Sequence, residues 1–153
     1  MPSKGYLSVM QNNTKITNWL LLLTRLWLGY NMAYGGGGFS SVRSILFIPH
    51  DRAFFIHWFG DELHYPFPLA MAFLAKGVEL LGGALVFLGL FTRVSASFIA
   101  FTMLMATLTA NLGKNFNVDG NITISYTLFA LFLIFWGGGK FSLDYYRHHR
   151  YSF

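Results

Sequence analysis

Residues 67–90 read FPLAMAFLAKGVELLGGALVFLGL, and this stretch decides the fold. It is 24 residues long. As a helix it would measure about 36 Å, enough to cross the roughly 30 Å hydrocarbon core of a bilayer with some tilt. Lys76 and Glu79 lie near its centre, spaced so that they share one helix face. The apolar residues around them leave no consistently polar face, so we expect a membrane-spanning helix whose charges point toward other helices. Gly83 continues the charged face, where we expect another backbone to approach closely.

The composition of the whole chain also favours a membrane protein. Hydrophobic residues make up 54% of the 153 residues and charged residues only 11%, whereas about 25% of the residues in an average soluble domain are charged. The length predicts a single domain, residues 1–153. The net charge is +5, but the basic residues lie at the ends of apolar runs and form no patch interleaved with polar residues. We therefore expect no nucleic-acid partner.

The chain contains no cysteine. This excludes disulfides, thiol redox catalysis, c-type haem attachment, thiolate-bound iron–sulfur clusters and zinc sites built from cysteine. We expect no metal site and no covalently bound cofactor. Any redox role would therefore require a cofactor supplied by another molecule, and the sequence alone does not decide whether the protein is an enzyme.

Four apolar runs predict an all-α membrane protein, a four-helix transmembrane bundle with spans at about 16–34, 67–90, 94–112 and 122–137. Glycines 35–38 should end the first helix, and a polar hairpin at 113–121 should join the third span to the fourth. Only residues 91–93 connect the second run to the third, so these two helices must be antiparallel neighbours. The third run is rich in small residues, which allow close helix packing in lipid. The fourth run barely reaches spanning length, and tilt or a thin local bilayer would close the gap.

The segment between the first two spans, residues 39–66, is the longest stretch outside the apolar runs. It carries a cluster of aromatic residues, Phe54, Phe55, Trp58 and Phe59, surrounded by charged side chains. One interpretation is a short amphipathic helix lying at the membrane interface between the first and second spans. The other is an ordinary aromatic-rich loop, and the sequence does not distinguish the two.

The distribution of basic residues predicts the orientation. With four spans, the side that holds both termini carries six Lys and Arg residues and the opposite side carries three. The positive-inside rule then places both termini in the cytoplasm. Residues 1–15 lack the apolar core and cleavage site of a signal peptide.

The charged residues inside the spans are the candidate site. Arg25 and Glu79 each lie near the midpoint of their runs, and because the two helices are antiparallel we expect them at similar depth, forming an ion pair with Lys76 nearby. Two cations and one carboxylate would leave excess positive charge. Asn31 and Tyr34, further along the first helix, would complete this polar core.

Two interpretations of this polar core remain open. In one, the excess positive charge binds an anionic or carbonyl-bearing ligand such as a quinone head group. In the other, the charges only fix the register of the first helix against the second, as buried ion pairs do in some proteins.

Three segments together resemble the DoxX family of small four-helix bacterial membrane proteins. They are residues 22–29 (LLTRLWLG), residues 72–83 (AFLAKGVELLGG) continuing to 88–93 (LGLFTR), and residues 137–144 (GGGKFSLD). The resemblance covers essentially the whole chain, and the second segment is its most specific part. The long segment 39–66 and the aromatic tail beyond Asp144 lie outside it.

The resemblance implies a membrane redox role, because the family includes proteins similar to the membrane subunit of thiosulfate:quinone oxidoreductase. We expect a cofactor-free inner-membrane subunit of a quinone-linked redox complex, surrounded by lipid and bound to a protein partner or to further copies of itself. The alternative is a non-catalytic membrane anchor or accessory subunit of a larger assembly. A small-solute transporter is a weaker interpretation, because the spans show no breaks or inverted repeats.

Overall fold

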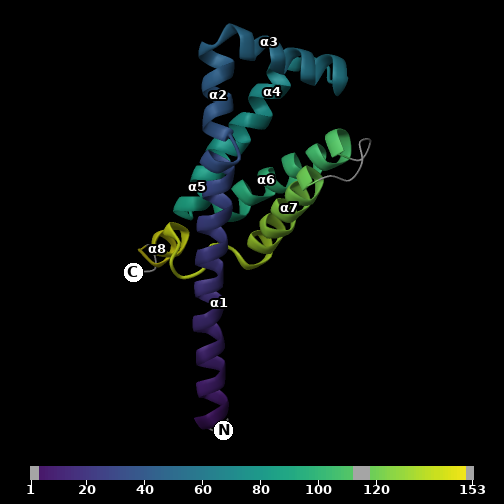
Figure 1. Cartoon of the computed structure of the whole chain (residues 1–153). Coiled ribbons are helices and arrows are strands. Elements are labelled where there is room, and N and C mark those ends of the chain that lie inside the picture. Colours follow the sequence, from purple (N-terminus) through teal and green to yellow (C-terminus); the bar gives the residue numbers. More distant parts are fainter. Residues whose placement is uncertain (1–3, 112–117, 151–153) are drawn as a thin grey trace.

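The computed structural model describes residues 4–111 and 118–150. These residues form helices joined by turns, with no strand among them. The elements, shown in Figure 1, are α1 (Lys4–Tyr30), η1 (Asn31–Gly35), α2 (Gly38–Phe47), α3 (Pro49–His57), η2 (Trp58–Glu62), α4 (Pro68–Gly77), η3 (Val78–Gly82), α5 (Gly83–Leu88), α6 (Thr92–Ala106), η4 (Thr107–Asn111), α7 (Val118–Trp136) and α8 (Leu143–Arg150). The four elements labelled η are π-helical turns that continue a preceding α-helix.

Two of the described helices are long and apolar enough to cross a membrane. They are the continuous helix Pro68–Leu88, made of α4, η3 and α5, and the helix Thr92–Thr109, made of α6 and part of η4. The apolar part of α7, Asn121–Trp136, is shorter. The first helix, α1 with η1, does not reach the same hydropathy because Asn18, Arg25 and Asn31 interrupt its apolar residues. The predicted second and third spans therefore have the expected length and composition, whereas a bundle of four spans is not established.

The first helix is longer than its apolar run. It begins at Lys4 rather than near Ile16, and its N-terminal part extends past the other helices in Figure 1. Gly37 adopts a φ of 91°, a left-handed conformation that glycine accommodates, and the chain turns there into α2. The predicted end of the helix at residues 35–38 is thus confirmed. The predicted hairpin at 113–121 lies mostly outside the described residues, and α7 begins at Val118.

Residues 39–66 hold most of α2 and all of α3, whereas the two interpretations of the sequence were one short helix or a loop. Ile48 is extended (φ −116°, ψ 104°), as expected before a proline, and Pro49 then begins α3. Arg52 on α3 donates hydrogen bonds to the Ile45 and Leu46 carbonyls at 2.8 Å, and so holds the end of α2. Ile45, Phe59 and Ala72 form a small core that packs this pair of helices against α4. The aromatic residues belong to α3 and η2, as the helical interpretation of this segment required.

A second core joins the remaining helices, with α6 beside α7 and α1 beside α5 (Figure 1). Its buried members come from α1, η1, α5, α6 and α7: Leu21, Leu28, Met32, Val86, Ala96, Ile99, Ala100, Met103, Ala130 and Leu133. Helix α6 also packs against η3, which confirms that the second and third runs are neighbours.

Glycines set the register of α1 against α5. A Cβ atom added to Gly29 would lie 2.6 Å from the Phe87 amide nitrogen, and one added to Gly83 would lie 2.6 Å from the Ala33 amide nitrogen. No side chain larger than hydrogen fits at either position unless the helices separate. The close backbone approach predicted at Gly83 is therefore confirmed, and the backbone that approaches is that of the first helix.

Candidate functional site

The structure separates the three charges that the sequence analysis placed together. Glu79 pairs with Lys76, whereas Arg25 lies against Gly89 near the end of α5. The predicted ion pair between Arg25 and Glu79 is wrong. The physical reason is the glycine contact between α1 and α5, because Gly29 against Gly83 and Phe87 leaves Arg25, one turn earlier, beyond the end of α5. Comparing midpoints of apolar runs could not reveal this register.

Lys76 and Glu79 form a tight pair within one helix. The Lys76 Nζ atom lies 2.9 Å from Oε1 and 2.8 Å from Oε2 of Glu79, so one ammonium group donates to both carboxylate oxygens. Glu79 is 7% exposed and the Lys76 side chain 18% exposed. This pair is electrically neutral, which corrects the expectation of excess positive charge at this site.

The pair lies where the helix geometry changes. Lys76 is in the last turn of α4, and Glu79 is the second residue of the π-helical turn η3. The turn η3 packs against η1, the π-helical end of the first helix. Single π-helical turns inside α-helices are rare and are frequent at functional sites. The predicted polar residues Lys76 and Glu79 thus occupy an irregular point near the middle of Pro68–Leu88.

An apolar groove lies on the surface of the same helix, between it and α6. Its volume is about 530 Å³, and the residues that line it come from α4, η3, α5, α6 and the connecting turn: Phe73, Leu74, Gly77, Val78, Leu81, Gly82, Leu85, Phe91, Val94, Ser95 and Phe98. A Cβ atom added to Gly77 would meet no atom within 4 Å. Phe73, one turn before Lys76, lines the groove, whereas neither Lys76 nor Glu79 is among its lining residues.

The other two predicted site residues lie away from the pair. The Asn31 side-chain amide donates a hydrogen bond of 2.8 Å to the Trp27 carbonyl of its own helix. Tyr34 is 65% exposed, and its ring lies near Tyr30 and Phe39. The structure therefore shows no contact of either residue with Lys76 or Glu79, and both belong to the outer face of η1.

Arg25 belongs to a second group of polar residues, which we call the terminal cluster: Arg25, Thr92, Ser142 and Asp144. The Arg25 guanidinium donates from Nη1 to the Gly138 carbonyl (3.2 Å) and from Nη2 to the Phe141 carbonyl (3.0 Å). The side chain is 3% exposed, and its Nε atom has no hydrogen-bond partner. Arg25 thus fastens the loop between α7 and α8 onto α1.

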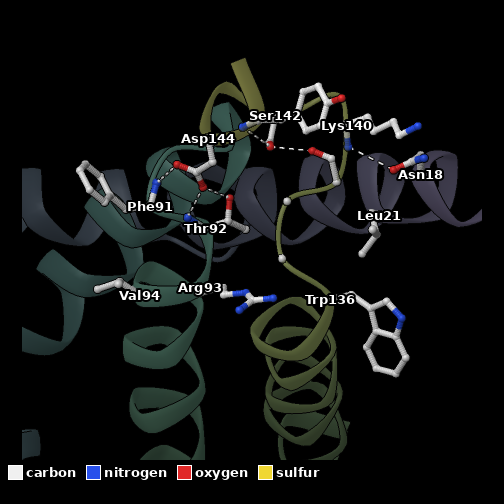
Figure 2. Close-up of a pocket in the computed structure, with 14 residues that line it drawn as sticks. Asn18, Leu21, Phe91, Thr92, Arg93, Val94, Trp136, Lys140, Ser142 and Asp144 are labelled. Carbon is white, nitrogen blue, oxygen red and sulfur yellow. Dashed lines mark hydrogen bonds between the residues drawn. The ribbon is translucent and has the colours of Figure 1, made fainter. Parts of the chain in front are cut away.

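Asp144 fastens α8 onto the start of α6. As Figure 2 shows, its carboxylate accepts hydrogen bonds from the Phe91 amide (2.7 Å), the Thr92 amide (2.8 Å) and the Thr92 hydroxyl (2.9 Å). The Asp144 backbone amide in turn donates a hydrogen bond of 2.9 Å to the Gly89 carbonyl. This is an N-cap supplied by a residue distant in sequence, so it satisfies helix donors that a local cap would otherwise satisfy.

Sequence reasoning missed Thr92 and Asp144 as a bonded pair. Both residues were among the quoted motifs, but nothing in their spacing shows that the ends of two helices meet. The signal was that the motifs containing Arg25, Thr92 and Asp144 all lie at ends of apolar runs or beside them. Within the described ranges, no group of three or more His, Asp or Glu residues is placed to hold a metal ion.

Comparison with known proteins identifies the family. The sequence profile of the DoxX family matches residues 20–112. A protein of Bacillus subtilis (strain 168) named "Putative oxidoreductase CatD" is 32% identical over 109 residues, which make up 67% of this chain and 79% of that protein. No solved structure shows significant similarity. The profile match covers more than half of the chain, and together with the apolar helices it shows that this protein is a membrane protein of the DoxX family.

Proposed function

We propose that the protein is a membrane-embedded subunit of a quinone-linked oxidoreductase and carries no redox group of its own. In this proposal the electrons come from a separate redox partner, and the chain supplies a binding site for the quinone within the membrane. The family and the relative named as an oxidoreductase support a redox role.

The observation that carries the proposal is a buried ion pair in an apolar helix that also lines an apolar groove. A quinone has a polar head with two carbonyl oxygens and a long apolar tail. The Lys76 ammonium has three N–H donors, of which two bind Glu79. The third can donate to a quinone carbonyl while Glu79 neutralises the charge of Lys76. The groove offers apolar and aromatic walls on which the tail can lie.

The proposal includes the topology predicted from the sequence. The helices Pro68–Leu88 and Thr92–Thr109 cross the membrane, and the apolar parts of α1 and α7 complete a bundle of four spans in a single domain. The exposed apolar side chains support this arrangement, because large aromatic and aliphatic residues cover the outer faces of all these helices. Both termini face the cytoplasm of a bacterium whose inner membrane holds the protein.

Bound quinone in the purified protein tests the proposal. The protein is purified from membranes in mild detergent, extracted with organic solvent, and the extract is measured by absorbance before and after reduction. We expect quinone in the wild-type protein and at least tenfold less in Gly77→Leu, whose side chain enters the groove without meeting protein atoms within 4 Å of its Cβ. Tyr34→Ala serves as the control, because Tyr34 does not line the groove and its replacement leaves the groove unchanged.

Two outcomes would contradict this function. Quinone absent from the wild-type protein, with no redox partner recovered by pull-down, would favour the alternative of a non-catalytic anchor or accessory subunit. The mutual neutralisation of Lys76 and Glu79 is the specific observation in favour of that alternative, because such a pair can serve packing alone. Equal quinone in wild type and Gly77→Leu would place the quinone outside the groove.

A further inference from the structure

A second groove, at the end of the molecule that carries the terminal cluster, is unused by the proposed function. Its volume is about 770 Å³, and it lies between the start of α6, the end of α7 and the loop before α8 (Figure 2). Two basic side chains line it, Arg93 and Lys140, and both are exposed. Asp144 is the one carboxylate among its lining residues.

The Asp144 carboxylate already accepts hydrogen bonds from its neighbours. Three donors from Phe91 and Thr92 surround its two oxygens, and the N-terminus of α6 adds favourable partial charge. Arg25, buried behind the loop, also attracts this carboxylate. Arg93 and Lys140 are therefore left as uncompensated positive charges at the groove, since no ion pair to either is present in the described part of the chain.

The loop itself offers backbone donors. Arg25 holds the Gly138 carbonyl, and in a planar trans peptide the amide of the next residue, Gly139, points in the opposite direction. Among the described residues, the amides of Gly138 and Gly139 donate to no acceptor, although Gly138 is buried. Buried amides without a partner are rare in native proteins. An anion with several acceptor oxygens would satisfy them.

The position of the groove indicates where this anion comes from. The two candidate spans are joined by residues 89–91, so Thr92 and Arg93 lie at the level where a crossing helix reaches the membrane surface. Exposed aromatic side chains gather at the same end of the molecule, namely Trp19, Phe91, Trp136 and Phe141. Trp and other aromatic residues are enriched at the level of lipid headgroups.

We propose that this groove binds the phosphate of an anionic phospholipid, with Arg93, Lys140 and the amides of Gly138 and Gly139 as its donors. The lipid's acyl chains extend along the exposed apolar faces of α6 and α7. The site holds α6, α7 and the loop before α8 together at the membrane surface. It is independent of the quinone proposal, because the two grooves share only Phe91 and Val94 as lining residues.

The test uses the full chain purified in detergent and stripped of lipid. Native mass spectrometry and thermal denaturation are recorded with added dioleoylphosphatidylglycerol, dioleoylphosphatidylcholine or inorganic phosphate. We expect phosphatidylglycerol to bind at least tenfold more tightly than phosphatidylcholine, and Arg93→Gln/Lys140→Gln to weaken this binding about tenfold. Arg43→Gln, which removes an exposed cation from α2 at the opposite end, should leave binding unchanged.

Three results would overturn the proposal. They are equal binding of the two lipids, an equal loss of phosphatidylglycerol in Arg43→Gln, and inorganic phosphate bound as tightly as the lipid, which would make free phosphate the ligand. Arg93 also donates to the Phe135 carbonyl at 3.2 Å, so its replacement can disturb the end of α7. Lys140→Glu avoids this problem because the Lys140 side chain is exposed, and it should weaken binding of phosphatidylglycerol on its own.

Discussion

The terminal cluster and the Lys76–Glu79 pair both bury charge, but they satisfy it differently. Arg25 and Asp144 are held by backbone groups of other segments, so each charge fastens one part of the chain to another. Lys76 and Glu79 satisfy each other within one helix and fasten nothing distant. The terminal cluster therefore has an evident structural role. The pair has none that requires charge, and this is why it is the better candidate for binding a ligand.

Glu79→Ala should give the largest effect on stability, because it leaves the Lys76 ammonium in an apolar helix without a partner. Removing one member of a buried pair costs about 3 to 5 kcal/mol. The free energy of unfolding can be measured by titration with dodecyl sulfate in mixed micelles. The double variant Lys76→Met/Glu79→Leu removes both charges and should lie within about 1 kcal/mol of the wild type.

The double variant also distinguishes a ligand-binding role of Lys76 and Glu79 from a structural one. If the pair binds quinone, the double variant keeps its stability and loses its quinone. A double variant that unfolds as readily as Glu79→Ala would show instead that the pair has a structural role after all.

Arg25→Met should have the next largest effect, about 2 to 3 kcal/mol, because two carbonyl groups lose a charged donor. The cost is moderated because the variant also removes the buried Nε atom that has no partner. The loop before α8 should detach, and trypsin should cut faster after the exposed Lys140. Arg25→Lys should restore only part of the protection, since lysine cannot reach both carbonyls with a planar fork.

Quinone content should distinguish Arg25→Met from the variants of Lys76 and Glu79. Arg25→Met should retain its quinone when it is still folded at the temperature of purification. Loss of quinone without loss of protease resistance would contradict the assignment of Arg25 to a structural role.

The sequence was sufficient for features that depend on local patterns. The helices Pro68–Leu88 and Thr92–Thr109, long and apolar enough to cross a membrane, follow from the apolar runs, and the close approach at Gly83 follows from a small residue on the charged face. The pairing of Arg25 depended on the register between two helices, which a contact with Gly29 sets. Helix α2 was missed although Pro49 marks the start of α3 in the sequence, because the bonds from Arg52 that hold the end of α2 form only once both helices are present.

Asp144→Ala should have a smaller effect, about 1 to 2 kcal/mol, which is the usual cost of losing an N-cap. The Phe91 and Thr92 amides would lose their acceptor at the start of α6. Hydrogen exchange of these two amides, followed by mass spectrometry, should accelerate while exchange in the middle of α6 stays slow. Acceleration along the whole of α6 would mean that Asp144 holds the complete helix rather than its first turn.

Tyr34→Ala should have the smallest effect, below about 0.5 kcal/mol, because the side chain is 65% exposed and its ring contacts are with Tyr30 and Phe39, themselves exposed. Its quinone content should equal that of the wild type, since Tyr34 makes no contact with Lys76 or Glu79. The variant thus tests whether Tyr34 belongs to the binding site, as the sequence predicted. A Tyr34→Ala protein that is stable but lacks quinone would return η1 to the binding site.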